Sequence, residues 1–336
     1  MKRGRRLNKK RVGTTIAVIA LVFFVIGGSA LLTKDSKKKG KNLEVREPKL
    51  ANSNIEEEAQ ENLPEENHPD ENVVQTTEES VEKPVETTKQ ETTVTETKKE
   101  KPVQQTTTKV AAGRVPVANE NAIALCKQAQ TAHVKDIYLT FDDGPSPDIT
   151  PQVLSILKQY NVPATFFVLG SRVELYPDLV RQEYNAGHYI ANHGYSHTYS
   201  SIYSSVQSVI DEYNAAEKAI QEALGMPEYH TLLFRFPGGS SGGTYDSIKG
   251  QAKSTLENMG IASTNWNCLN GDAEGGSRTK EQLINRLYET AEGWDSLVVL
   301  MHDANDKQTT VDALPEIIEH YLAEGYTFKN YYEIFQ

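Results

Sequence analysis

The chain has 336 residues and a net charge of −11, but the charge is distributed unevenly. Residues 1–41 carry twelve Lys and Arg against one acid, whereas residues 42–117 sum to −8 and residues 118–336 to −14. Because phosphate binding needs clustered Lys and Arg, this acidic part argues against nucleic acid as a partner. The only cysteines, Cys126 and Cys268, exclude a disulfide framework and leave room for one bridge at most.

An uncharged apolar segment lies near the start of the chain, at residues 14–32. It is long enough to cross a bilayer as a helix, and seven Lys and Arg residues precede it. We therefore expect residues 1–13 to form a basic cytoplasmic tail and residues 14–32 to form a single membrane anchor, with the rest of the chain extracellular. The small residues before and at Ala30 leave one alternative open, a signal segment cleaved near Ala30 that releases a secreted protein.

Residues 33–117 differ from the rest of the chain because they contain no Phe, Tyr or Trp. A segment so rich in Glu, Thr, Lys and Gln cannot bury enough apolar surface to offset the chain entropy lost on folding. We therefore predict a disordered extracytoplasmic linker there. Residues 118–336 contain all the Tyr and both Trp residues, and this length fits one folded domain.

Within residues 118–336, short β-branched or aromatic runs alternate with amphipathic stretches of helical period. The predicted strands are 137–141, 165–169, 189–192, 232–236, 261–267, 296–301 and 326–329. The predicted helices are 149–160, 174–186, 205–224, 245–259, 280–292 and 309–323. This alternation predicts an α/β fold with a parallel sheet, either closed or open. Residues 118–136 have no assigned element and could form a small cap before the first strand.

Residue types suited to chemistry fall at the carboxyl ends of these predicted strands. Asp142 and Asp143 end the first, His193 and His197 follow the third, Arg235 ends the fourth, Asp272 follows the fifth and His302 ends the sixth. In barrels and open α/β sheets, sites lie on that face. We therefore expect these side chains to share one site.

His193 and His197 are four residues apart, and Gly194 between them favours a loop over a helix. The spacing alone is also common on solvated surfaces, so a metal site needs a carboxylate as well. Asp142 or Asp143 could supply it, although neighbouring strand side chains converge only where a strand ends. Two His and one carboxylate suit one divalent metal ion that activates water, zinc above all, with Co²⁺ or another divalent ion left open.

Hydrolysis of an amide also needs a base for the water and an acid for the departing amine. The second aspartate and His302 are residue types that serve these purposes. Arg235 emerges from an apolar strand, where burial without a carboxylate would be costly, so we expect it to pair with Asp142. An ordinary structural ion pair elsewhere is the alternative. The Gly-rich run at 238–243 lacks the Lys and Ser or Thr of a phosphate-binding loop, so we do not expect it to bind a nucleotide.

Five segments together resemble the polysaccharide deacetylase family, also known as carbohydrate esterase family 4 or the NodB homology domain. They are TFDDGP at 140–145, HGYSH at 193–197, RFPGG at 235–239, WNCLNGDA at 266–273 and LMH at 300–302. The resemblance covers about Ile137 to Tyr326 and is greatest to bacterial peptidoglycan N-acetylglucosamine deacetylases. It implies a distorted (β/α) barrel of about seven parallel strands.

The resemblance also implies a role for each matching residue. Asp143, His193 and His197 would be the metal ligands, Asp142 the general base braced by Arg235, and His302 the general acid held by Asp272. The backbone N–H of Gly238 would stabilise the oxyanion and Leu300 would line the acetyl pocket.

Two positions depart from the family pattern: Gly194 replaces a Ser or Thr that braces the loop, and Ala273 replaces a Trp. We assign no chemistry to the other histidines, His68, His133, His188, His230 and His320.

By this resemblance the protein is expected to be a metal-dependent hydrolase of linear amides. Its substrate would be the N-acetyl group of N-acetylglucosamine in a cell-surface glycan, above all peptidoglycan. Chitin oligomers, an exopolysaccharide and acetylxylan remain as other substrates, and a catalytically inactive glycan-binding surface protein is a rival from another class. A metallophosphoesterase would need more bridging carboxylates. No protein partner is evident from the sequence.

Overall fold

The computed structural model describes residues 114–336. The predicted tail, the predicted anchor and residues 33–113 of the predicted linker lie outside these residues. Within the described part, every helix is too short or too polar to cross a membrane.

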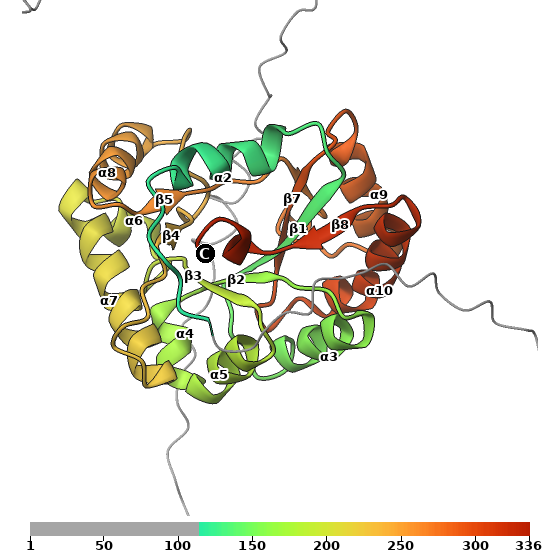
Figure 1. Cartoon of the computed structure of the whole chain (residues 1–336), viewed down its shortest axis with the longest axis horizontal. Coiled ribbons are helices and arrows are strands. Elements are labelled where there is room, and N and C mark those ends of the chain that lie inside the picture. The colour runs from blue at the N-terminus through green and yellow to red at the C-terminus, as the bar shows by residue number, and fades with distance from the viewer. Residues whose placement is uncertain (1–113) are drawn as a thin grey trace, which may run out of the picture. The chain divides into compact units, whose positions relative to one another are not determined.

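One parallel sheet forms the centre of the described domain. Seven strands pair in the order β5-β4-β3-β2-β1-β7-β6, and an eighth pairs with the first half of β1. The strands are β1 (Asp136–Asp142), β2 (Thr165–Val168), β3 (Tyr189–Asn192), β4 (Leu233–Phe234), β5 (Ala262–Ser263), β6 (Cys268–Leu269), β7 (Leu297–His302) and β8 (Thr327–Lys329). The sheet curls into a half-barrel with β5 and β6 at its edges, which agrees with the predicted α/β class and is consistent with a distorted (β/α) barrel (Figure 1).

Helices surround this half-barrel, as Figure 1 shows. They are α2 (Ala122–Thr131), α3 (Thr150–Tyr160), α4 (Gly170–Leu175), α5 (Pro177–Asn185), α6 (Tyr199–Ile202), α7 (Val206–Leu224), α8 (Asp246–Asn258), α9 (Lys280–Ala291) and α10 (Gln308–Ala323), and a 3₁₀ turn, η1 (Tyr331–Glu333), follows β8. All six predicted helices are present. The predicted helix 174–186 is interrupted at Tyr176, because Pro177 has no N–H to continue the preceding turn and begins α5 instead.

Both faces of the sheet are buried, and the side chains of β1 point alternately to one face and to the other. Ile137, Leu139 and Phe141 belong to the outer core, the apolar cluster between the sheet and the surrounding helices. Tyr138 points the other way, into the inner core that the curled sheet encloses. Because side chains alternate along a strand, Asp142 shares the inner face with Tyr138 and reaches it at the carboxyl end. This alternation positions the site.

Two elements without a counterpart in the sequence prediction fill the amino-terminal end of the half-barrel. Helix α2 contacts β5 and β7, and the side chain of Gln130 donates a hydrogen bond to Thr264 Oγ1 at 3.0 Å. The turn η1 places Tyr331 in the inner core, with its hydroxyl 2.9 Å from the same Thr264 oxygen. Residues 118–136 therefore do include a cap before the first strand, and it contacts β5 at one edge of the sheet and β7 next to the other edge.

The run predicted as one strand at 261–267 contains only the short strand β5, followed by an irregular segment that leads to β6 at Cys268. The backbone carbonyls of Thr264 and Asn265 accept hydrogen bonds from the guanidinium of Arg235 at 3.4 and 3.3 Å. Carbonyls used in this way are not available to a neighbouring strand. The β-branched and aromatic composition of this run was therefore a misleading signal.

Cys126 and Cys268 are both free and buried, so the one bridge that the sequence left open is not formed. Cys126 lies in the inner core and Cys268 in the outer core, on opposite sides of the sheet. Burial raises the pKa of the Cys126 thiol to about 12 and raises the pKa of Cys268 as well. Both residues act as small apolar side chains in the core.

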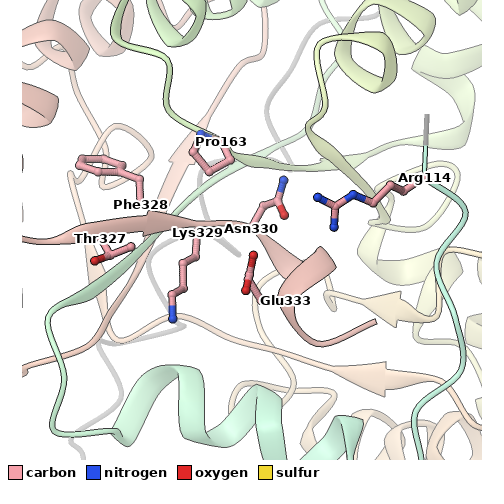
Figure 2. A pocket seen from close by; sticks show the side chains of 7 residues that line it. All are labelled: Arg114, Pro163, Thr327, Phe328, Lys329, Asn330 and Glu333. Carbon is pink, nitrogen blue, oxygen red and sulfur yellow. The ribbon is translucent and has the colours of Figure 1, made fainter. Parts of the chain in front are cut away.

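A small pocket lies beside β8, which pairs with residues 136–138 at the beginning of β1. Figure 2 shows its lining residues: Arg114, Pro163, Thr327, Phe328, Lys329, Asn330 and Glu333. None of the residues expected to carry chemistry is among them. The chemistry-bearing side chains follow the other end of β1.

Candidate active site

Three side chains with metal-ligating atoms converge after the carboxyl ends of β1 and β3. Nε2 of His193 lies 3.4 Å and Nε2 of His197 lies 3.3 Å from Oδ1 of Asp143. The ligand atoms of all three lie within 4.8 Å of one another. Asp143 has a left-handed backbone, with φ 72°, so it leaves the alternation of β1 and its carboxylate reaches the same site as Asp142.

The donor set fits a divalent cation. Oδ1 of Asp143 is buried and accepts no hydrogen bond from the described residues, which is a costly state for a carboxylate oxygen that a cation would relieve. Burial opposes ionisation of Asp143, but the imidazoles of His197, His302 and His193 outweigh it and lower its pKa to about 2. Burial lowers the pKa of His193, which favours the neutral imidazole that binds metals. Two nitrogens and one oxygen form a candidate metal-binding triad.

A contact from the residue directly after β4 orients the first histidine. Nδ1 of His193 lies 2.8 Å from the backbone oxygen of Arg235, and it donates the hydrogen bond because a carbonyl only accepts. Nε2 therefore carries the lone pair that faces Asp143. Such a partner on the far ring nitrogen is the usual support of a metal-ligating histidine.

Asp142 has a different environment from its neighbour. Nη1 of Arg235 lies 2.8 Å from Oδ1 of Asp142 and also donates to Thr140 Oγ1 at 2.7 Å. The guanidinium is fully buried and packs 3.9 Å above the ring of Phe167. The pairing expected from the sequence is therefore present. Oδ2 of Asp142 is 3.7 Å from Nε2 of His193, so this carboxylate borders the triad.

His302 ends β7 and is the register partner of Asp142 on β1. Its Nδ1 lies 2.7 Å from Oδ1 of Asp272, and its backbone N–H donates to Oδ2 at 3.0 Å. The hydroxyl of Thr310 donates to the same Oδ2 at 2.7 Å. Burial opposes ionisation of Asp272, but the charge and hydrogen bond of His302 lower its pKa below the ordinary value. Nε2 of His302 points to the triad, 4.0 Å from Oδ2 of Asp143.

Gly238 follows β4 in a left-handed conformation, with φ 67°. A Cβ at this position would lie 2.8 Å from the hydroxyl of Tyr199, whose ring is 5.5 Å from the ring of His197. Tyr203 donates a hydrogen bond to the Pro237 carbonyl at 2.6 Å and so fixes the preceding peptide. Gly238 is therefore held close to the second histidine of the triad.

Leu300 lies on β7 two residues before His302, so both side chains belong to the inner face. It is buried and pairs in register with Thr140 of β1. Ala273 directly follows Asp272 and is partly exposed. The small side chain leaves the surface next to Asp272 without the aromatic ring of the family pattern.

Two acidic residues near the site were missed in the sequence. Glu212 of α7 accepts hydrogen bonds from the loop that carries His197. Asp303 is fully buried and accepts a hydrogen bond from Thr150 Oγ1 at 2.5 Å, and burial raises its pKa to about 7. Its position directly after His302 was a signal that could have drawn attention to it. Glu212 had none, because it resembles any polar residue on an amphipathic helix.

The chain is similar to known deacetylases in sequence. The family model described as polysaccharide deacetylase matches residues 129–258. A peptidoglycan-N-acetylglucosamine deacetylase of Bacillus cereus is 34% identical over 198 residues, which are 58% of this chain and 85% of the relative. The peptidoglycan-N-acetylglucosamine deacetylase PgdA of Listeria monocytogenes is 33% identical over 204 residues, 60% of this chain, but the chain spans only 39% of that relative's length.

Solved structures show the same likeness. A CE4 esterase of Streptococcus mutans superposes with a TM-score of 0.57 at 31% identity, covering 62% of this chain and 90% of that structure. The catalytic domain of a peptidoglycan N-acetylglucosamine deacetylase from Eubacterium rectale gives 0.54 at 34% identity, covering 58% and 88%. With the half-barrel, the triad and these likenesses together, the chain belongs to the polysaccharide deacetylase family, CE4, of hydrolases that act on acetylated glycans.

Proposed function

We propose that this protein is a metal-dependent deacetylase that removes the acetyl group from N-acetylglucosamine residues of peptidoglycan. The observation that carries the proposal is the placement of three groups around one point. The paired Asp142 lies 3.7 Å from His193 and His302 lies 4.0 Å from Asp143, so both border the triad of Asp143, His193 and His197. A water and an acetamide between these groups would meet a base, an acid and a cation.

We propose zinc as the ion, because two imidazole nitrogens and one carboxylate with an open position are typical zinc ligands. Bound there, a divalent ion lowers the pKa of water and polarises the acetyl carbonyl. Co²⁺ or another divalent ion with the same ligand preference would serve the same chemistry.

The protein's own groups then have defined tasks. Asp142, held by Arg235, accepts a proton as the water oxygen attacks the acetyl carbon. The N–H of Gly238 donates to the oxygen on which negative charge develops. His302, oriented by Asp272, donates a proton from Nε2 to the nitrogen as the carbon–nitrogen bond breaks. The products are acetate and a glycan with a free amine, and Leu300 borders the space for the acetyl methyl group.

Peptidoglycan is the proposed glycan for two reasons. Several similar proteins are described as peptidoglycan deacetylases, although PdaC of Bacillus subtilis, 33% identical over 192 residues, is described as acting on N-acetylmuramic acid. The sequence also predicts an anchor at 14–32 and a linker at 33–117 before the domain at 118–336. An enzyme tethered outside the membrane in this way could reach nearby wall, and cleavage near Ala30 would release it instead.

The test is acetate release by the purified full-length chain in detergent. Peptidoglycan, chitin oligomers and acetylxylan are incubated with the protein before and after chelation, and again after zinc is restored. We expect release from peptidoglycan that disappears with chelator and returns with zinc. Faster release from another glycan would reassign the substrate, and no release from any of them with zinc present would favour the inactive glycan-binding protein.

A further inference from the structure

The segment from His193 to His197 holds two metal-ligating side chains on a loop with an unusual backbone. Gly194 has φ 86° and His197 has φ 58°. A left-handed conformation costs a residue with a Cβ about 1 kcal/mol or more, so the position of the His197 imidazole has to be maintained by contacts. Gly194 has no side chain with which to provide them.

The first half of this loop is held by its own strand and by α4. Asn192 Oδ1 accepts a hydrogen bond from the N–H of Gly194 at 2.9 Å, and the N–H of Gly170 donates to the Gly194 carbonyl at 2.9 Å. His193 is fixed separately through the carbonyl of Arg235. These contacts end before the second histidine.

The carboxylate of Glu212 makes most of the contacts to the second half, where the N–H of Ser171 also donates to the Tyr195 carbonyl at 3.2 Å. Oε2 of Glu212 accepts hydrogen bonds from the backbone N–H groups of Tyr195 and Ser196, both at 2.7 Å. Its Oε1 accepts one from the hydroxyl of Ser196 at 2.7 Å. Hydrogen bonds to an ionised acceptor are about twice as strong as neutral ones. Two of them hold the N–H groups of Tyr195 and Ser196, and the third holds the side chain of Ser196, the residue directly before His197.

Glu212 can hold the loop because the helix that carries it is itself fixed in the fold. It lies on α7, whose N-terminus is capped by Ser205 and whose next turn buries Tyr213 in the apolar cluster with Phe234. Helix α7 itself contributes no residue to the triad. The carboxylate therefore transfers the fixed position of the helix to the loop.

We propose that Glu212 is a positioning residue that sets the metal affinity of this site by orienting His197. The inference rests on the proposed function, because it assumes that the triad holds a metal ion. Residues that orient ligands in this way typically contribute about 10- to 100-fold to metal affinity. Glu212 thereby supplies, from a distant helix, the support that Gly194 cannot give.

The experiment compares metal dissociation constants of the metal-free full-length chain, measured for Zn²⁺ and Co²⁺ by competition with a chromophoric chelator. Glu212→Ala should weaken both by about 10- to 100-fold. Glu212→Gln should recover much of this loss, because its amide oxygen still accepts the two N–H bonds. Asp211→Asn is the matched control: it is the preceding residue on α7, it is exposed, and its Oδ1 accepts only from Gln207 among the hydrogen bonds seen. It should bind metal like the parent.

A second readout separates positioning from a general contribution to folding. With excess metal, Glu212→Ala should regain most of its kcat with an unchanged KM, so that the defect appears as a higher metal requirement. If its metal dissociation constants equal those of the parent while the metal-free chain melts at a lower temperature, Glu212 is only structural and the inference fails. A parent chain that binds no metal would instead overturn the proposed function.

Discussion

The candidate site has two sides that differ in one respect, namely whether each buried carboxylate has a hydrogen-bond donor or a cationic partner within the protein. On the ligand side, formed by Asp143, His193 and His197, the carboxylate Oδ1 is buried without a hydrogen-bond donor among the described residues. The other side, called the paired side below, begins with Asp142, whose Oδ1 lies 2.8 Å from Nη1 of Arg235. The paired side also includes Asp272, which accepts three hydrogen bonds from His302 and Thr310.

This difference explains how two adjacent aspartates can have different tasks. Asp142 ends a strand in the inner face and meets a guanidinium, so its charge is already balanced. Asp143 turns out of the strand, and its Oδ1 lies 3.4 and 3.3 Å from Nε2 of His193 and His197. The ligand side therefore leaves a carboxylate oxygen without a donor among the described residues, whereas on the paired side Arg235 and His302 hold the carboxylates.

The largest effect is expected from breaking the ligand side. His193→Ala removes one of three ligands, so the purified variant should contain no stoichiometric metal and its acetate release should fall to background. Elemental analysis after gel filtration, together with the acetate assay, measures both. A His193→Ala variant that keeps one metal ion per chain would show that the triad is not the metal site.

Breaking the paired side should affect turnover and leave the metal in place. Asp142→Asn removes the proton acceptor and preserves its shape, so kcat should fall by about 10²- to 10⁴-fold while bound zinc remains at the parent level. The same two assays apply. If Asp142→Asn loses zinc instead, the tasks of Asp142 and Asp143 are the reverse of those proposed.

A smaller loss is expected farther along the paired side. Asp272→Asn leaves His302 in place but weakens the contact that orients its ring, so kcat should fall by up to about 10²-fold, part of the usual contribution of a general acid. Thr310→Val removes only one hydrogen bond to Asp272 and should cost less. Steady-state kinetics on one glycan substrate would rank the two. A larger loss for Thr310→Val than for Asp272→Asn would contradict this orientation of His302.

The smallest change concerns stability, at a buried carboxyl outside both sides. Glu183 of α5 is fully buried, and burial followed by the charge of Asp303 raises its pKa well above the ordinary 4.5. Folding therefore takes up a proton above pH 4.5, and the stability that this carboxyl contributes below pH 4.5 is lost as the pH rises towards its folded pKa. Glu183→Gln has no such proton. It should gain stability relative to the parent above pH 4.5, by up to ~1.4 kcal/mol for each pH unit.

Urea unfolding of the parent and of Glu183→Gln at pH 5 and pH 8 measures this difference. The gain should be clearly larger at pH 8. An equal difference at the two pH values would mean that Glu183 is ionised in the folded protein. A buried partner for its carboxylate would then have to be found.

Much of the fold could be predicted because local signals agree with it. Helix α7 was predicted almost to the residue, since Ser205 caps its start and Gly225 ends it with φ 67°. The run at 261–267 could not be predicted, because its carbonyls bond to Arg235, a contact between residues distant in sequence. Glu212 was missed for the same reason. A contact between one side chain and residues distant in sequence leaves no periodic pattern in the sequence from which it could be predicted.

The site shows the same limit on a smaller scale. Strand ends indicated which residues would meet, and the structure brings Asp142, Asp143 and His302 to one place. Alternation along β1 did not say which aspartate faces the histidines, since that depends on the left-handed turn at Asp143. Family resemblance suggested the assignment of the two aspartates, which stays a prediction.

Arg235 links the two sides within a single residue. Its backbone carbonyl holds His193, while its side chain holds Asp142, so the spacing between the ligand side and the paired side follows from the covalent structure of one amino acid directly after β4. Transplanting this site to another scaffold would therefore require the strand as well as the two loops. A graft that copied the aspartates and histidines alone would bring the right atoms without the element that keeps them at a fixed separation.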